Sequence, residues 1–336
     1  MPRDPYRNFS TYKIDPLTEI RNLGIVTAGD VFWVSSPSDS DHTDRVDQLG
    51  RGVVKVSGQA AVDVCSNDQN DYVLFVPSDA NAVFGLGTAL DVNKDRVHMF
   101  GLGANKAKNS YSVTIRTNMG TTQDTELVNV TGDGVELGGL RFLGTLGTHA
   151  GGTMSNGVLF VQGHDLWVHD CVVEDSTNIW GTPPVVRGGG TAAHDARFDD
   201  CYFALTGTGN VESAGNSPMV VGGDGNKRWL FNRCYWRMPA GSVTETFFSP
   251  GTGAKETTVL RDCHFGLING TTHAITSAIR GSTTANNPVL CINCTGLSVT
   301  QIGTDPNVYK TPVQSGTRAV TYDQGLAVGT AMLIAA

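Results

Sequence analysis

Charged and polar pairs recur at equivalent places in the middle of this chain, and their side chains could do chemistry. Two carboxylates a few ångströms apart can serve as the acid and base of a glycosidase, and carboxylates beside an arginine base can hold Ca²⁺ in a lyase. Asp199, Asp200 and Arg233 are the candidates for such a site. The same residue types also suit chain bends, so a purely structural role is the competing interpretation. The pairs are His169-Asp170, Asp199-Asp200, Asn232-Arg233, Arg261-Asp262 and Ile292-Asn293.

Cysteine and histidine could provide redox or metal chemistry. Among the seven cysteines, Cys291 and Cys294 have C-x-x-C spacing. A zinc site would need two more ligands close in space, and the nearest histidine pair, His164 and His169, lies far upstream. We therefore predict that the cysteines are reduced and buried as small apolar side chains. We expect no metal and no cofactor.

Composition excludes several partner classes. The formal net charge of −8 and the absence of a dense Lys/Arg run argue against nucleic-acid binding. No window approaches the ~20 apolar residues of a membrane helix. The polar residues 1–7 lack the apolar core of a signal peptide. We expect a soluble protein that is made in a cytoplasm and binds no membrane.

The elements that would position the polar pairs follow from one repeated pattern. Cysteines at 171, 201, 234, 263 and 294 are spaced by 30, 33, 29 and 31 residues. When each cysteine is counted as position zero, positions −5, −3, 0 and +2 are mostly apolar, and −2 and −1 are mostly polar. Two further copies have Leu102 and Leu140 at position zero. The chain therefore contains at least seven repeats.

The spacing of the apolar positions predicts the conformation of each repeat. Positions two apart share one face of a strand, whereas the step of three from −3 to zero breaks the alternation. A bend at −2/−1 returns both pairs to the same interior, and Asn, Asp and Gly tolerate the left-handed backbone that this bend needs. Strand, bend, strand, loop and third strand make one coil of a parallel β-helix, with two internal columns of side chains. These columns are Leu102, Leu140, Cys171, Cys201, Cys234, Cys263 and Cys294, and Phe142, Val173, Phe203, Trp236 and Phe265.

The chain before the repeats predicts a cap. Ser57 is a helix N-cap residue, and a helix over 57–65 would bring Ala61, Val64 and Cys65 to one side, where they would plug the end of the stack. We expect an early strand at 31–34, a polar loop at 35–45 and the first rung at 72–77. The predicted organisation is a 1–56 N-terminal arm and lead-in segment, a 57–300 β-helix with its capping helix, and a 301–336 tail suited to docking.

The order of these features resembles the pectate-lyase-like right-handed parallel β-helix proteins, especially those of tailed-phage virions. The resemblance rests on the stretches Val31-Phe-Trp-Val34, Ala60-Ala-Val-Asp-Val-Cys65, Val73-Leu-Phe-Val-Pro77 and Val97-His-Met-Phe-Gly-Leu-Gly103, and covers about residues 30–296. It implies an all-β, right-handed, single-stranded parallel β-helix of about seven or more coils. The association of phage β-helices further implies a homo-oligomer, such as a trimer.

Catalytic motifs of this group are present only in fragments. Asp199-Asp200-Cys201 resembles the Asp-Asp-Cys stretch of polygalacturonases, but their Asn-Thr-Asp, Gly-His-Gly and Arg-Ile-Lys motifs are absent. Arg237-Met238-Pro239 matches half of the pectate lyase signature, and Ser242 stands where the second arginine should be.

The favoured hypothesis is accordingly a non-enzymatic structural protein of a phage particle, either a capsid decoration or a fibre-like component. Its partners would be capsid or other virion proteins, held through the chain termini, and its location would be the virion. The alternative is a polysaccharide-binding or polysaccharide-cleaving β-helix that acts on surface glycans. Its cleft would then lie beside Asp199, Asp200 and Arg233.

Overall fold

Each repeat folds as a strand, a one-residue bend and a second strand, as the apolar spacing predicts. In the repeat centred on Cys171, the side chains of Leu166, Val168, Cys171 and Val173 are all buried. Asp170 lies between the two strands with a φ of 55°. The bend is therefore confined to position −1, because the residue at −2 still belongs to the first strand.

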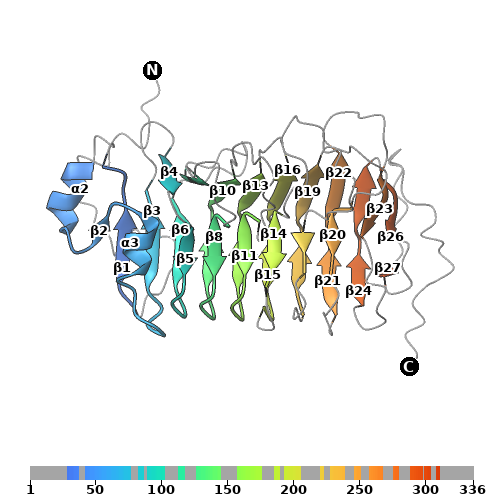
Figure 1. Ribbon diagram of the computed structural model, residues 1–336, viewed down its shortest axis with the longest axis horizontal. Coiled ribbons are helices and arrows are strands. Elements are labelled where there is room, and N and C mark those ends of the chain that lie inside the picture. Colours follow the sequence, from blue (N-terminus) through green and yellow to red (C-terminus); the bar gives the residue numbers. More distant parts are fainter. Residues whose placement is uncertain are drawn as a thin grey trace, which may run out of the picture.

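A computed structural model gives the coordinates. It describes residues 29–37, 42–76, 82–86, 89–102, 113–117, 126–144, 157–175, 185–189, 193–205, 220–222, 228–238, 246–250, 257–267, 275–279, 288–297, 299–303 and 308–310. In these residues the strands make eight successive three-strand coils that stack side by side along the long axis (Figure 1). In the same residues, no helix is long and apolar enough to cross a membrane.

The first strand of each repeat contributes to an eleven-stranded parallel sheet, here called sheet A. Its strands follow one another along the rod in chain order, except that β2 lies outside β1. In this spatial order they are β2 (Val54–Lys55), β1 (Val31–Val34), β3 (Tyr72–Phe75), β6 (His98–Gly101), β9 (Glu136–Gly138), β12 (Trp167–His169), β15 (Arg197–Asp199), β18 (Leu230–Asn232), β21 (Thr258–Arg261), β24 (Val289–Ile292) and β27 (Val308–Lys310).

The second and third strands of each coil form two eight-stranded parallel sheets. Sheet B follows the bend and comprises β4 (Ala82–Leu86), β7 (Val113–Thr117), β10 (Arg141–Gly144), β13 (Val172–Asp175), β16 (Tyr202–Leu205), β19 (Tyr235–Met238), β22 (His264–Leu267) and β25 (Thr295–Leu297). Sheet C comprises β5 (Leu90–Val92), β8 (Val128–Val130), β11 (Leu159–Val161), β14 (Val186–Gly188), β17 (Val220–Val221), β20 (Phe248–Ser249), β23 (Ile275–Ile279) and β26 (Val299–Gly303). The prediction of a right-handed parallel β-helix is confirmed.

Left-handed residues mark two corners of the coil. The predicted corner at position −1 is occupied by Gly139, Asp170, Asp200, Arg233, Asp262 and Asn293, with φ between 53° and 64°. A second corner lies at position −6, between sheets C and A, and the sequence pattern did not indicate it. It is occupied by Arg96, Gly134, Asp165, Asp195 and Arg228, with φ between 52° and 66°. The basic residues at these corners carry the conformational cost that non-glycine residues have at positive φ.

The two predicted columns form the interior, with one correction. Residues Leu140 to Cys294 of the first column and all five of the second are buried. Leu102 was predicted to begin the first column, but its side chain is only partly buried. It packs in a separate cluster with Trp33, Tyr72 and Leu74 on the N-terminal coils. Because β6 is in register with β9, the backbone of Leu102 keeps the repeat while its side chain lies outside the main core.

The thiols of the first column also make a regular bond. Cys201 Sγ donates to the carbonyl of Val168 at 3.4 Å, and Cys234 Sγ donates to that of Phe198 at 3.3 Å. In each case the acceptor is at position −3 of the preceding coil, and the remaining column cysteines follow the same rule. All seven cysteines are free and buried, as predicted. Burial raises the pKa of the Cys171 thiol to about 12, so it stays protonated.

The N-terminal end departs from the prediction in two places. The expected polar loop at 35–45 gives way to helix α2 (His42–Leu49), whose Val46 and Leu49 pack on the separate cluster. Strand β1 pairs with β3, so a rung precedes the one expected to be first.

The capping helix α3 (Gly58–Val62) is present, and the Ser57 hydroxyl accepts from the amide of Ala60 at 3.2 Å. Ala61 and Cys65 face the core, but Val64 is exposed, since the helix ends at Val62.

At the other end, β26 and β27 extend the sheets to Lys310, past the expected limit at residue 300. The predicted anchoring segment, 326–336, lies outside the described residues, as does the arm before residue 29.

Candidate functional site

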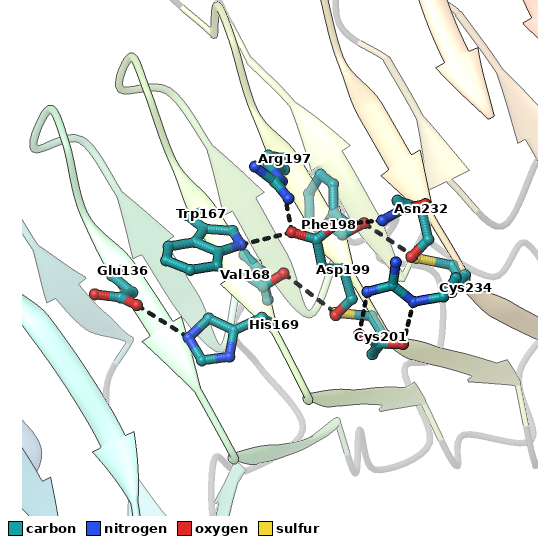
Figure 2. Close-up of polar contacts among 12 residues, drawn as sticks. Glu136, Trp167, Val168, His169, Arg197, Phe198, Asp199, Cys201, Asn232 and Cys234 are labelled. Atoms are coloured by element: carbon teal, nitrogen blue, oxygen red, sulfur yellow. Dashed lines mark hydrogen bonds and ion pairs between the residues drawn. The ribbon is translucent and has the colours of Figure 1, made fainter. Parts of the chain in front are cut away.

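The outer face of sheet A carries the candidate residues. Side chains at −3 and −5 point inward, so those at −4 and −2 point outward. The register aligns Glu136, Trp167 and Arg197 in one outward column, and Gly138, His169, Asp199 and Asn232 in the other. Figure 2 shows how these side chains from neighbouring coils meet.

Asp199 is held on this face by three donors. Its Oδ2 accepts from Trp167 Nε1 at 2.8 Å and from Arg197 Nε, and its Oδ1 accepts from Asn232 Nδ2 at 2.9 Å (Figure 2). Only 4% of the residue is exposed. Burial alone would raise the pKa of this carboxyl, but the bonds from Asn232, Arg197 and Trp167 outweigh it and lower the pKa. Asp199 therefore remains a carboxylate that joins three coils.

Asp200 and Arg233 make a separate pair at the corner between sheets A and B. Arg233 Nε and Nη2 donate to the two oxygens of Asp200 at 2.9 and 2.6 Å. This bidentate pair joins neighbouring coils at the solvent surface, and it raises the pKa of the Arg233 guanidinium. An arginine held in its charged form is a poor base for proton abstraction. Asp199 and Asp200 thus take different partners and do not form one acid–base pair.

The site also contains Glu136 and His98, which sequence reasoning missed. Glu136 accepts from His98 Nδ1 at 2.6 Å and from His169 Nε2 at 3.0 Å, and His169 Nδ1 lies 3.1 Å from Asp170 Oδ2. Burial alone would raise the pKa of Glu136, but the bonds to both histidines lower it to about 2. The only sequence signal for Glu136 was its outward position in a repeat that has no cysteine.

Trp167 is an exposed aromatic residue on this face. It is 40% exposed, and the guanidinium carbon of Arg197 lies 5.5 Å from its ring centroid. The ring of His169 lies 4.5 Å away on the neighbouring column. A sugar ring can stack on an exposed indole, and the neighbouring cation can attract an anionic group of the ligand.

The histidines and cysteines that were considered as zinc ligands are not brought together. His164 stacks on His194 at a centroid distance of 4.7 Å, whereas His169 bonds Glu136 and Asp170. Cys291 and Cys294 both point into the core. In the part of the chain that the structure describes, no group of three or more His, Cys, Asp or Glu side chains is placed to bind a metal.

Comparison with known proteins identifies the fold. No family model and no curated protein matches the sequence. Among solved structures, Escherichia coli YbhC aligns with a TM-score of 0.53 at 11% identity, over 86% of this chain and 76% of that one. A pectin methylesterase variant in complex with a hexasaccharide aligns with a TM-score of 0.52 at 12% identity, over 85% and 91%. The chain thus has the pectate-lyase-like parallel β-helix fold, and at this identity the likeness concerns the fold alone.

Proposed function

We propose that this chain is a non-enzymatic structural protein of a phage particle, a rigid β-helix rod that acts as a capsid decoration or fibre-like component. The observation that supports this is that the candidate acids, Asp199 and Asp200, are already engaged in hydrogen bonds and ion pairs. Asp199 bonds three side chains, and Asp200 is paired with Arg233 across two coils. Both carboxylates thus bond side chains of neighbouring coils, and bonds of this kind stiffen a rod. The resemblance of the chain's opening segments to tailed-phage β-helix proteins supports placing the rod on a particle.

The test is association with the cognate particle. Purified full-length chain is incubated with particles that lack it, and bound protein is measured after sedimentation. We expect saturable binding, and a loss of about tenfold or more in affinity when residues 326–336 are deleted. A chain with the same segment scrambled is the matched control, and it should also bind weakly. Absence of binding by the full-length chain would contradict the proposal, whereas unchanged binding of the deleted chain would reject the tail's role alone.

The second candidate is a β-helix that binds or cleaves acidic polysaccharides, and the exposed Trp167 beside Arg197 is the observation that favours it. The full-length chain is incubated with a panel of acidic polysaccharides, and binding, new reducing ends and unsaturated products are measured. Products that disappear in Asp199→Asn would establish cleavage and overturn the non-enzymatic proposal. Binding without products that is lost in Trp167→Ala, but kept in Tyr235→Ala on sheet B, would establish a binding face.

A further inference from the structure

Both ring nitrogens of His169 face carboxylate oxygens. Nε2 lies 3.0 Å from Glu136 Oε1, and Nδ1 lies 3.1 Å from Asp170 Oδ2. An ionised carboxylate can only accept, and a neutral imidazole has a single N–H. Both contacts are hydrogen bonds only when the ring is an imidazolium. The geometry around His169 therefore favours the protonated ring over the neutral one.

The same carboxylate extends the contact to a third coil. The second oxygen of Glu136 lies 2.6 Å from His98 Nδ1. Glu136 on β9 therefore contacts His98 on β6 at one side and His169 on β12 at the other. The three side chains are between 16% and 19% exposed, which limits screening by solvent. We call His98, Glu136 and His169 the clasp.

Few other charged groups near the clasp could affect the protonation of His169. On β15, Arg197 and Asp199 are paired with each other, and on β3 the ring of Tyr72 stacks on His98 at 4.7 Å. Gly138 provides the room for His169, because a Cβ at this glycine would lie 2.7 Å from His169 Cε1. Among the described residues, Glu136 and Asp170 are thus the acids in direct contact with the ring.

We propose that the clasp is a pH-responsive device that ties the coils of β6, β9 and β12 together when His169 is protonated and loosens them when it is not. This goes beyond the proposed structural role, because it assigns a condition under which one part of the rod opens more easily. Loss of the proton leaves one ring nitrogen as a lone pair facing a carboxylate, which turns an attraction into a repulsion.

The direction of the pH effect follows from the same contacts. Burial alone would lower the pKa of His169, but the bonds to Glu136 and Asp170 outweigh it and raise the pKa above its ordinary value of 6.5. The stabilisation is therefore complete below pH 6.5 and is lost as the pH rises through the folded-state pKa. Glu136, whose pKa is lowered from 4.5 to about 2, contributes fully above pH 4.5 and loses this contribution as the pH falls from there to about 2.

Hydrogen–deuterium exchange of the full-length chain tests the proposal. Protection of the amides of β9 and β12 is measured at about pH 5.5 and about pH 8.5, corrected for intrinsic exchange and divided by that of β18 on the same sheet. We expect this ratio to fall on going to the higher pH, by about tenfold for each unit by which the pKa of His169 is raised. A ratio that does not change with pH would overturn the proposal.

Variants show whether the clasp causes the change. His169→Gln should abolish the pH dependence of the ratio, and Glu136→Gln should do the same if the first variant does not fold. His264→Gln on β22 is the matched control, since His264 is also partly buried but contacts Thr295. It should keep the full effect. A pH-dependent ratio that survives in His169→Gln, or a His169 ring that titrates below pH 6.5 by NMR, would reject the clasp.

Discussion

Asp199 and Asp200 are neighbours in the sequence and lie in different environments. Asp199 ends a strand and points outward into a set of donors, and Asp200 is the left-handed corner that follows. At each repeat the residue at −2 ends the strand and points outward, whereas the residue at −1 takes the left-handed conformation, and side chains at both positions contact neighbouring coils. The chemistry of a residue in this protein is therefore set first by its place in the coil.

The corner at Asp262 gives a prediction at this scale. Its φ of 53° suits glycine, whereas a β-branched residue is strained there. We expect Asp262→Val to lower the free energy of unfolding by about 1–2 kcal/mol or more, and Asp262→Gly to change it by less than about 1 kcal/mol. Chemical denaturation of the two variants measures the difference. Both variants lose the bond from Asn293, so equal losses in the two would show that the corner conformation is not the cause.

Sheet B shows how stacking couples the elements. Its inward column is in register from Phe142 through Val173, Phe203 and Trp236 to Phe265. The rings pack on one another, with Trp236 lying 5.0 Å from Phe203 and 5.5 Å from Phe265 between centroids. Each strand inside this column is thus supported by side chains on both neighbouring coils, and a packing defect in one rung disturbs the next.

Trp236 provides the prediction for this element. The side chain is fully buried, yet its Nε1 has no hydrogen-bond partner among the described residues. We expect Trp236→Ala to lower the free energy of unfolding by about 3–5 kcal/mol, because it opens a cavity. Trp236→Phe should cost less than about 2 kcal/mol, since it keeps a ring in the column and removes the unsatisfied N–H.

Thermal or urea unfolding of the two variants checks this pair of values. A phenylalanine variant that is as unstable as the alanine variant would mean that the indole N–H has a partner.

At the scale of the molecule, the rod is a stack in which each coil pairs only with its neighbours. Such a structure is approximately a sum of coils and of the interfaces between them. Helix α3 packs at the N-terminal end against β1, β3 and β5, where the first coils would otherwise expose apolar residues. The length of the rod is therefore adjustable, provided that the inward positions stay in phase.

Deletion of one coil tests this modularity. Removing residues 201–233 joins Asp200 to Cys234. Asp200 and Arg233 occupy the same corner position, −1, in successive coils, so every inward position is restored. We expect a folded chain with a single unfolding transition and an m-value lower by about a tenth, in proportion to the surface removed. Removing 201–231 instead places Asp200 at position −3, which would bury a charge, and should prevent native folding. Circular dichroism and urea titration distinguish the two chains, and equal behaviour would contradict the modular description.

Most of the coil architecture could be predicted from residue types, and the candidate site only in part. The repeat indicated Asp199, Asp200 and Arg233, whereas Glu136, His98 and Trp167 were missed. The spacing around Cys171 and its equivalents predicted the strands, the corner at −1 and the two internal columns. The corner at −6 was missed because it lies outside the apolar positions −5 to +2 that define the repeat, so no break in their alternation marks it. The α2 helix was missed because its residues, His42–Leu49, are mostly polar.

Inward residues all meet the same requirement, since each must be apolar and match the coil above and below, so the requirement leaves a repeated pattern in the sequence. Outward residues such as Glu136 and Trp167 obey no common rule. Their hydrogen-bond partners lie 32 to 38 residues away, across loops of unequal length. Sequence alone thus determined the coil and what fills it, including the cysteine column. Only the tertiary structure decided which outward side chains meet, because strand register brings them together and no periodicity records it.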